Sequence, residues 1–336
     1  MNKKVAINGF GRIGRLVFRQ ILIGQELDVV AVNDIAPLDN LLYLLKHDSV
    51  QISPAISFEM EGNKMNWYGR EITFLSERNP EDLPWKEMGV DIVIESSGIF
   101  TKREDAAKHL KAGASHVIIS APSKDADITV CMGVNEWDID PKEHLVISNA
   151  SCTTNCLAPV AKVLDEVFGI EYGFLTTIHA YTSSQSIVDA PSKKWRRGRA
   201  GAVSIVPKTT GAAIATTLVL PQLKGKVDGL AMRVPIPVGS IIDFVAQTEK
   251  PVSVERVNNA FKEAAESNQL KGILGVTEEE LVSADIVGNN HSAIVDAQST
   301  MVLGDHTVKV LAWYDNEWGY ARRVADLAIY INQKTQ

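Results

Sequence analysis

Cys152 is the residue with the clearest potential for chemistry, because it lies in a run of small polar side chains, Ser148-Asn149-Ala150-Ser151-Cys152-Thr153-Thr154-Asn155-Cys156. The run separates the apolar segment 145–147 from a helical pattern, so we expect Cys152 in the first turn of a helix. The helix dipole and unpaired N–H groups would lower the pKa of the thiol and favour the nucleophilic thiolate. The neighbouring hydroxyls, those of Ser151, Thr153 and Thr154, could bind an anion at the same terminus.

A buried structural role is the alternative for Cys152, since free cysteine is among the most buried residue types. The polar neighbours favour the reactive interpretation. Cys156 lies one turn further along the same helix face, and Cys131 lies within an apolar strand pattern. We expect both of these to be packing residues.

His179 ends a predicted strand over 172–179. A histidine in this position could serve the structure alone. Beside an activated cysteine it becomes the natural base, since an imidazole can stabilise the thiolate as an ion pair and later move a proton. The sequence therefore predicts a cysteine–histidine pair, and we expect no metal site.

A second site is predicted at Gly9-Phe10-Gly11-Arg12-Ile13-Gly14, which follows a strand and opens a helix. The glycines allow a tight turn, close approach of the backbone to a pyrophosphate, and close helix–strand packing. Asp34 ends the next predicted strand, where an acid accepts hydrogen bonds from ribose hydroxyls and repels a 2′-phosphate. This pattern favours NAD over NADP, although a solvated turn acid is the alternative for Asp34.

Composition limits the classes of protein that could carry these sites. The chain has 336 residues, 45% of them hydrophobic, and a net charge of −7. The negative balance argues against a dedicated nucleic-acid binder, and no apolar run approaches the roughly 20 residues that span a bilayer. Three cysteines suit a reducing compartment rather than a disulfide framework. We expect a cytoplasmic protein.

The first 150 residues alternate between apolar strands and helical patterns, which is typical of a doubly wound parallel sheet in an α/β fold. The predicted strands are 5–7, 29–32, 91–94 and 117–119. The predicted helices are 12–22, 37–46 and 101–112, the last opened by a capping box at Thr101 and Glu104. Residues 52–75 differ, because turn signals at 62–63 and 69–70 indicate an antiparallel insertion.

Beyond residue 150 the elements indicate an α+β domain on a mostly antiparallel sheet. We expect helices at 152–167 and 253–267, strands at 172–179, 229–234, 241–248 and 307–314, and a last helix from 317.

Five segments together resemble the phosphorylating glyceraldehyde-3-phosphate dehydrogenases: Asn8–Gly14, Ala150–Cys156, His179–Thr182, Thr209–Ala213 and Trp313–Tyr320. The resemblance runs from residue 3 to about residue 330. It implies an N-terminal Rossmann domain over 1–151, a catalytic domain over 152–316, and a C-terminal helix, 317–336, that packs back on the first domain. It also implies a homotetramer.

The resemblance implies an oxidoreductase of glycolysis or gluconeogenesis that converts glyceraldehyde 3-phosphate, inorganic phosphate and NAD to 1,3-bisphosphoglycerate. Cys152 would form a thiohemiacetal and then a thioester, with His179 as the base. The matching cofactor positions are Gly9, Gly11, Arg12, Ile13, Gly14, Asp34, Arg78, Ser120 and Asn316. The matching substrate and phosphate positions are Ser151, Thr153, Thr182, Arg197, Thr210, Gly211 and Arg233.

Three positions depart from the family pattern. Ser184 stands where many members carry an acid, which alters one edge of the phosphate pocket, and Ser97 replaces a common threonine. Ala190 is small for a loop that reaches the adenosine of a neighbouring subunit in the family, which leaves acceptance of NADP open.

Two other functions compete with this interpretation. An erythrose-4-phosphate dehydrogenase would share the cysteine and glycine motifs, but the retained Thr210-Gly211 pair favours the phosphorylating enzyme. The basic run 193–199, five cations around Trp195, could instead belong to an RNA-binding module, for which we expect at most weak and salt-dependent affinity.

Overall fold

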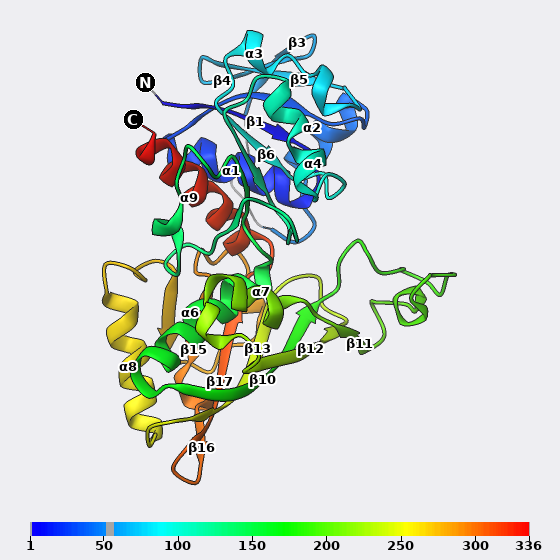
Figure 1. The fold of residues 1–336 in the computed structure, drawn as a ribbon. Helices are drawn as coiled ribbons and strands as arrows, with labels where there is room; N and C mark the ends of the chain where they lie inside the picture. Colours follow the sequence, from blue (N-terminus) through cyan, green and yellow to red (C-terminus); the bar gives the residue numbers. More distant parts are fainter. Residues whose placement is uncertain (1, 52–56, 336) are drawn as a thin grey trace. The chain divides into compact units, whose positions relative to one another are not determined.

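The computed structural model describes residues 2–51 and 57–335, and these form two compact units (Figure 1). The first unit comprises residues 1–130, 136–150 and 321–336, and the second comprises 131–135 and 151–320. Part of the predicted insertion at 52–75, namely 52–56, lies outside the described residues. No helix in the described ranges is both long and apolar enough to cross a lipid bilayer.

The first unit is built on one sheet. Its strands are β1 (Lys4–Asn8), β2 (Asp28–Asn33), β3 (Glu59–Glu61), β4 (Lys64–Trp67), β5 (Arg70–Leu75), β6 (Ile92–Glu95), β7 (His116–Ile119), β8 (Ile128–Thr129) and β9 (Val146–Ser148), in the order β3-β4-β5-β2-β1-β6-β7-β9-β8. The strands from β5 to β9 in this order pair in parallel. Their order is that of a dinucleotide-binding doubly wound fold, so the predicted parallel sheet is confirmed.

An antiparallel extension at one edge confirms the insertion predicted between residues 57 and 75. Gly62 and Asn63 join β3 to β4, and Tyr68 and Gly69 join β4 to β5. Three of these four loop residues are glycine or have positive φ, as two-residue hairpins require. β5 belongs to both parts of the sheet, because it also pairs in parallel with β2.

The helices of the first unit are α1 (Arg12–Gly24), α2 (Leu38–Lys46), α3 (Trp85–Met88), α4 (Arg103–Ala106) and α5 (Lys108–Lys111), and residues 321–334 of α9 (Trp318–Lys334) also belong to it. The prediction of one helix over 101–112 was wrong. Two short helices occupy the segment, and the first begins after Lys102 with no side-chain cap. The capping box at Thr101 is therefore not formed.

The second unit also has one main sheet. Its strands are β10 (Ile170–Ala180), β11 (Val206–Thr209), β12 (Val227–Val234), β13 (Ser240–Thr248), β14 (Leu274–Thr277), β15 (Ala293–Asp296), β16 (Met301–Leu303) and β17 (Thr307–Tyr314), in the order β11-β12-β10-β13-β17-β15-β14 with β16 beside β17. Most pairs of described strands are antiparallel, but β10 pairs in parallel with β12, and β14 with β15. A parallel sheet plus a mixed sheet confirms the α/β class.

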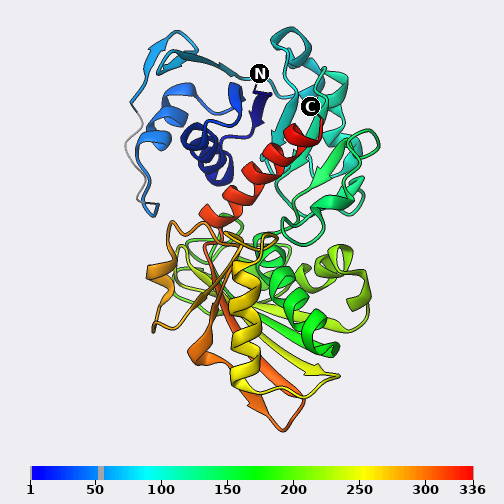
Figure 2. The ribbon, with the colours of Figure 1, turned by 90° about the vertical axis from the view of Figure 1, so that its left-hand side faces the viewer.

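The helices of the second unit are α6 (Cys152–Phe168), α7 (Ala212–Val219) and α8 (Val254–Glu266). Helix α6 packs against the sheet, and α8 runs beside α6, as Figure 2 shows. The helix starts at Cys152 because Ser151 is extended and its Oγ accepts a hydrogen bond from the N–H of Thr154 at 3.1 Å. The helix start thus coincides with the predicted nucleophile.

Candidate active site

Cys152 and His179 meet in the second unit. The Cys152 Sγ lies 3.3 Å from His179 Nε2, with the thiol in the first turn of α6 and the imidazole near the end of β10. The two residues are 27 positions apart in the sequence. The predicted pair is therefore in hydrogen-bond contact.

The other two cysteines are packed away from this pair. Cys156 is 0% exposed, and its Sγ points to the carbonyl of Ala312 at 3.8 Å. Cys131 is buried as well, but it follows β8 in a loop rather than lying in a strand, and its N–H donates to the Asn135 side chain.

The electrostatics of the thiol differ from the expectation. Burial raises the pKa of Cys152 above its ordinary value, and the charge of Arg233 and hydrogen bonds with Thr153 act in the opposite direction without reversing the shift. The prediction of a lowered pKa for Cys152 was therefore wrong. The physical reason is that the free energy lost when a thiolate is removed from water exceeds the stabilisation that the helix terminus provides.

His179 is neutral at physiological pH. Burial, followed by the nearby charge of Arg233, lowers its pKa to about 3. Its Nδ1 lies 2.7 Å from the carbonyl oxygen of Ala180. Because the imidazole is neutral and the pKa of the thiol is raised, the pair is a neutral thiol beside a neutral base rather than an ion pair.

Arg233 joins this pair from the neighbouring strand. It stands opposite His179 in the register of β10 and β12, and its Nη1 contacts both His179 Nδ1 and the Ala180 carbonyl. This contact places the guanidinium of Arg233 close enough for its charge to act on the pKa of the Cys152 thiol.

The remaining predicted phosphate positions lie in four separate local structures. Thr153 is buried, and its Oγ1 lies 2.9 Å from the Tyr314 hydroxyl. Thr182 Oγ1 is 2.9 Å from Ser184 Oγ, so Ser184, at the position where many family members carry an acid, contacts the Thr182 hydroxyl.

Thr210 accepts a hydrogen bond from the N–H of Ala212, and Gly211 is the N-cap of α7. Arg197 lies in the loop before β11, and its buried Nε has no hydrogen-bond partner.

Asn316 is oriented by a short hydrogen-bond chain. The Ala180 N–H donates to Ser240 Oγ at 3.1 Å, and that hydroxyl donates to Asn316 Oδ1 at 2.9 Å. Because its oxygen accepts from Ser240, the amide is held in one orientation beside the strand that carries His179.

The glycine segment of the first unit has the geometry of a dinucleotide loop. Gly9 has φ +91°, and a Cβ on Gly14 would lie 2.0 Å from the Gly9 carbonyl oxygen. A Cβ on Gly11 would meet nothing within 4 Å, so Gly11 faces open space where a ligand can approach the backbone. No side chain caps α1, which begins at Arg12. These residues fit a dinucleotide.

A cavity of about 520 Å³ lies beside this loop, at the carboxyl ends of β1, β2 and β6. Asp34 and Arg78 line it, as do Gly9 and Gly11. Asp34 Oδ2 also accepts the N–H of Phe10 at 2.7 Å, which ties the predicted ribose-binding acid to the glycine loop.

Three further predicted cofactor positions belong to the first unit but are not among the residues that line this cavity. Arg12 pairs with Asp48 at 2.6 Å, and Ile13 follows it in the first turn of α1. Ser120 follows β7, and its N–H donates to the carbonyl of Glu95.

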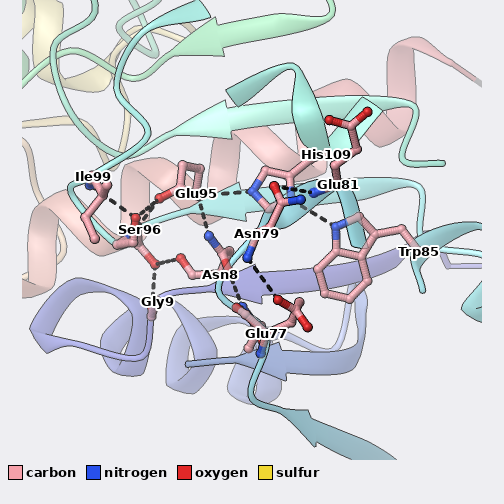
Figure 3. Close-up of polar contacts among 12 residues, drawn as sticks. Asn8, Gly9, Glu77, Asn79, Glu81, Trp85, Glu95, Ser96, Ile99 and His109 are labelled. Carbon is pink, nitrogen blue, oxygen red and sulfur yellow. Dashed lines mark hydrogen bonds and ion pairs between the residues drawn. The ribbon is translucent and has the colours of Figure 1, made fainter. Parts of the chain in front are cut away.

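A buried polar network supports the cavity wall (Figure 3). Glu95 accepts hydrogen bonds from Asn8 Nδ2 at 2.5 Å and from the N–H of Ser97 at 2.8 Å, and His109 Nε2 lies 3.1 Å from the same carboxylate. Trp85 Nε1 donates to His109 Nδ1. Since the network joins β6 to the end of β1, it holds the glycine loop in place.

Comparison with known proteins covers nearly the whole chain. Residues 3–103 match the glyceraldehyde 3-phosphate dehydrogenase NAD binding domain, and residues 151–316 match the C-terminal domain of the same family. The chain belongs to the glyceraldehyde-3-phosphate dehydrogenase family.

Curated relatives agree with this assignment. The chain is 59% identical over 334 residues to the glyceraldehyde-3-phosphate dehydrogenase of Geobacillus stearothermophilus, with 99% of each chain covered. It is 54% identical over 335 residues to that of Streptomyces coelicolor, covering 99% of this chain and all of the relative. It is 56% identical over 334 residues to glyceraldehyde-3-phosphate dehydrogenase 1 of Bacillus subtilis, with 99% of each covered.

The family resemblance inferred from five motifs is thus confirmed, and with it the class of NAD-dependent oxidoreductase and NAD as the cofactor. The family carries out the glycolytic, phosphorylating oxidation of glyceraldehyde 3-phosphate.

Sequence reasoning missed two residues that the structure places at the site. The Tyr314 hydroxyl lies 2.9 Å from both Thr153 Oγ1 and Thr177 Oγ1, and its ring meets that of His179 edge to face. The alternation of β17 could have indicated it, because a tyrosine on the buried face of a strand needs a partner for its hydroxyl. Ser240 carried no such signal, since its role depends on the pairing of β13 with β10.

Proposed function

We propose that this chain oxidises glyceraldehyde 3-phosphate to 1,3-bisphosphoglycerate with inorganic phosphate and NAD, using Cys152 as the nucleophile and His179 as the base. The observation that carries the proposal is the 3.3 Å contact between Cys152 Sγ and His179 Nε2 at the start of α6, in a chain of this family.

The first step forms a bond between Cys152 Sγ and the aldehyde carbon. His179 Nε2 takes the thiol proton as the bond forms, which a neutral imidazole can do and an imidazolium cannot. This removes the need for a preformed thiolate, so the raised pKa of the free thiol is compatible with attack. The imidazolium of His179 returns this proton to the former carbonyl oxygen as the C=O π bond breaks, and the product is a thiohemiacetal on Cys152.

The second step removes a hydride from the same carbon while His179 assists loss of the hydroxyl proton, and a thioester remains on Cys152. NAD, when bound, supplies the hydride acceptor. The residues proposed to hold it are Gly9, Gly11, Arg12, Ile13, Gly14, Asp34, Arg78, Ser120 and Asn316. An oxygen of inorganic phosphate then attacks the thioester carbon, the C–S bond breaks, and the thiol is regenerated.

Two phosphate groups must be bound during this sequence. We assign them to Ser151, Thr153, Thr182, Arg197, Thr210, Gly211 and Arg233. Guanidinium groups, hydroxyls and the start of α7 offer the charge-assisted hydrogen bonds that phosphate oxygens prefer.

The domain assignment follows the same proposal. Residues 1–151 with the C-terminal helix 317–336 would bind the cofactor, and 152–316 would carry the chemistry. The expected compartment is the cytoplasm.

The loop between β10 and β11 supports a homotetramer. Its apolar side chains are strongly exposed in the single chain, with Trp195 90%, Ile187 83% and Val203 80% accessible. Such exposure marks an interaction surface. Sedimentation equilibrium should give four times 36.7 kDa, and a monomer at micromolar concentration would refute the proposal.

One assay tests the proposed activity. The purified protein should reduce NAD with glyceraldehyde 3-phosphate, and the rate should depend on inorganic phosphate. NADP and erythrose 4-phosphate serve as comparisons, since Asp34 and the Thr210-Gly211 pair predict lower rates with both. Equal or faster reduction with erythrose 4-phosphate, or no dependence on phosphate, would contradict the proposal.

A further inference from the structure

Lys208, which the sequence reasoning did not single out, shares a sheet face with the residues proposed for catalysis. In the register of the sheet, β12 lies between β10 and β11, and Arg233 stands opposite His179 on one side and Val206 on the other. Lys208 is two residues from Val206 on β11, so its side chain emerges on the same face as that of Arg233. Diagonal neighbours of this kind are within reach of long side chains.

Arg197 and Lys208 also border one cavity of about 480 Å³, which the basic segment 193–197 and residues 206–209 enclose. None of its lining residues is acidic. The cavity therefore presents cationic groups from two segments to the same space.

The cations Arg197, Lys208 and Arg233 have no carboxylate partner within the described residues. The buried Nε atoms of Arg197 and Arg233 also lack a hydrogen-bond partner. In contrast, Arg199 in the same loop pairs with Asp189 at 3.0 Å. Partly buried cations without a counter-charge are unfavourable unless an anion joins them.

The pKa values agree with this geometry. Burial and then the charges of Arg233, Arg197 and Lys194 lower the pKa of Lys208 to about 8, while Cys152 acts weakly in the opposite direction. Lys208 in turn contributes to the lowered pKa of His179. Lys208 is therefore in electrostatic range of both reacting residues.

We propose that Lys208 binds a phosphate group of the reactants together with Arg197 and Arg233. This inference rests on the proposed function and adds a specificity-determining residue to it. The ligand is a phosphate dianion, either the phosphate of the aldehyde or inorganic phosphate. A third cation would favour such doubly charged groups over uncharged aldehydes.

The first test replaces the charge. Lys208→Met should raise the KM for inorganic phosphate or for glyceraldehyde 3-phosphate about tenfold, and the substrate affected identifies the phosphate that Lys208 contacts. Lys208→Arg should restore most of the affinity. Lys224→Met is the matched control, because it removes the same charge from an exposed position of the second unit that does not line this cavity, and it should change either KM less than twofold.

The second test does not depend on turnover. The dissociation constant of sulfate, measured by calorimetry on the wild-type protein with NAD, should weaken as pH rises from 7 toward 8.8, because Lys208 loses its proton in this range. The groups that face it are Arg233 on β12, Arg197 and Lys194 in the loop, Cys152 on α6 and His179 on β10. The pKa of His179, about 3, lies below this range, and burial raises the pKa of Cys152 above its ordinary value. In Lys208→Met the dissociation constant should be larger and nearly independent of pH.

The two measurements separate this inference from the proposed function. A wild-type protein that binds sulfate through Lys208 but does not oxidise the aldehyde would refute the activity and retain the anion site. Unchanged KM values and an unchanged sulfate dissociation constant in Lys208→Met would refute the role of Lys208 in an active enzyme.

Discussion

Helices α1 and α6 each follow a strand after a short loop, and their first turns have different tasks. Helix α1 starts after Gly11 with no side-chain cap, and a side chain at Gly11 would point into open space. Helix α6 starts after Ser151, whose hydroxyl caps the Thr154 N–H, and it presents a thiol beside an imidazole. One terminus leaves the backbone open to a ligand, and the other holds a reactive group.

The difference shows that a helix terminus alone does not determine the chemistry. Both ends carry the same partial positive charge. At α6 the buried surroundings dominate, because they raise the pKa of the Cys152 thiol despite the helix end and the nearby Arg233. At α1 the lack of a Cβ on Gly11 is decisive, because it lets a ligand approach the backbone more closely than a side chain would allow. The following predictions test this distinction.

The largest effect is expected from Cys152→Ser, compared with Cys156→Ser on the same helix. The first variant should lose about 10⁴-fold or more in kcat, because it removes the nucleophile. The second should keep turnover within about threefold, with a lower Tm, because Cys156 only fills buried space. Steady-state kinetics and thermal unfolding measure both, and similar losses of kcat in the two variants would exclude covalent catalysis by Cys152 alone.

Replacing His179 by Asn should lower kcat by roughly 10²–10⁴-fold, as expected for loss of a general base. The wild-type pH profile should show no imidazole ionisation between pH 5 and 8, because the pKa of His179 is about 3. A loss smaller than tenfold in the variant would assign His179 a structural role.

The reaction of Cys152 with iodoacetamide tests the raised pKa directly. In the protein without cofactor or anions, the rate should increase about tenfold per pH unit from pH 6 to 8, because the thiolate fraction grows in this proportion below the pKa. Cys156→Ser provides the background for counting modified thiols. A rate that is already at its plateau at pH 7 would show that the helix end outweighs burial after all.

The smallest effects are expected at the glycine loop, where Gly11→Ala and Gly14→Ala form a matched pair. Gly11→Ala should weaken NAD binding about tenfold with unchanged stability, because its methyl group meets only the space reserved for the ligand. Gly14→Ala should instead lower the free energy of unfolding by about 1–3 kcal/mol, because its Cβ would lie 2.0 Å from the Gly9 carbonyl oxygen. Cofactor titration and urea denaturation separate the two, and equal effects on both quantities would contradict the distinction.

Local pattern was sufficient for much of the fold. The parallel strands and the hairpins of the insertion follow from apolar runs and turn residues, and α6 starts where the apolar segment 145–147 gives way to a helical pattern. The 101–112 segment was misjudged, because an amphipathic pattern does not reveal that the chain leaves the helix at Ala107. Strands β14 and β15 are short, and their register depends on neighbours far along the chain.

The sequence by itself determined which residue types could react and where the helices at Arg12 and Cys152 begin, because glycines and apolar spacing act over a few residues. It also identified the family, since five motifs occur in the right order. Only the tertiary structure decided the protonation states and the neighbours. The thiol, the imidazole, Arg233 and Lys208 come from four different elements, and the desolvation that sets their pKa values exists only once those elements pack together.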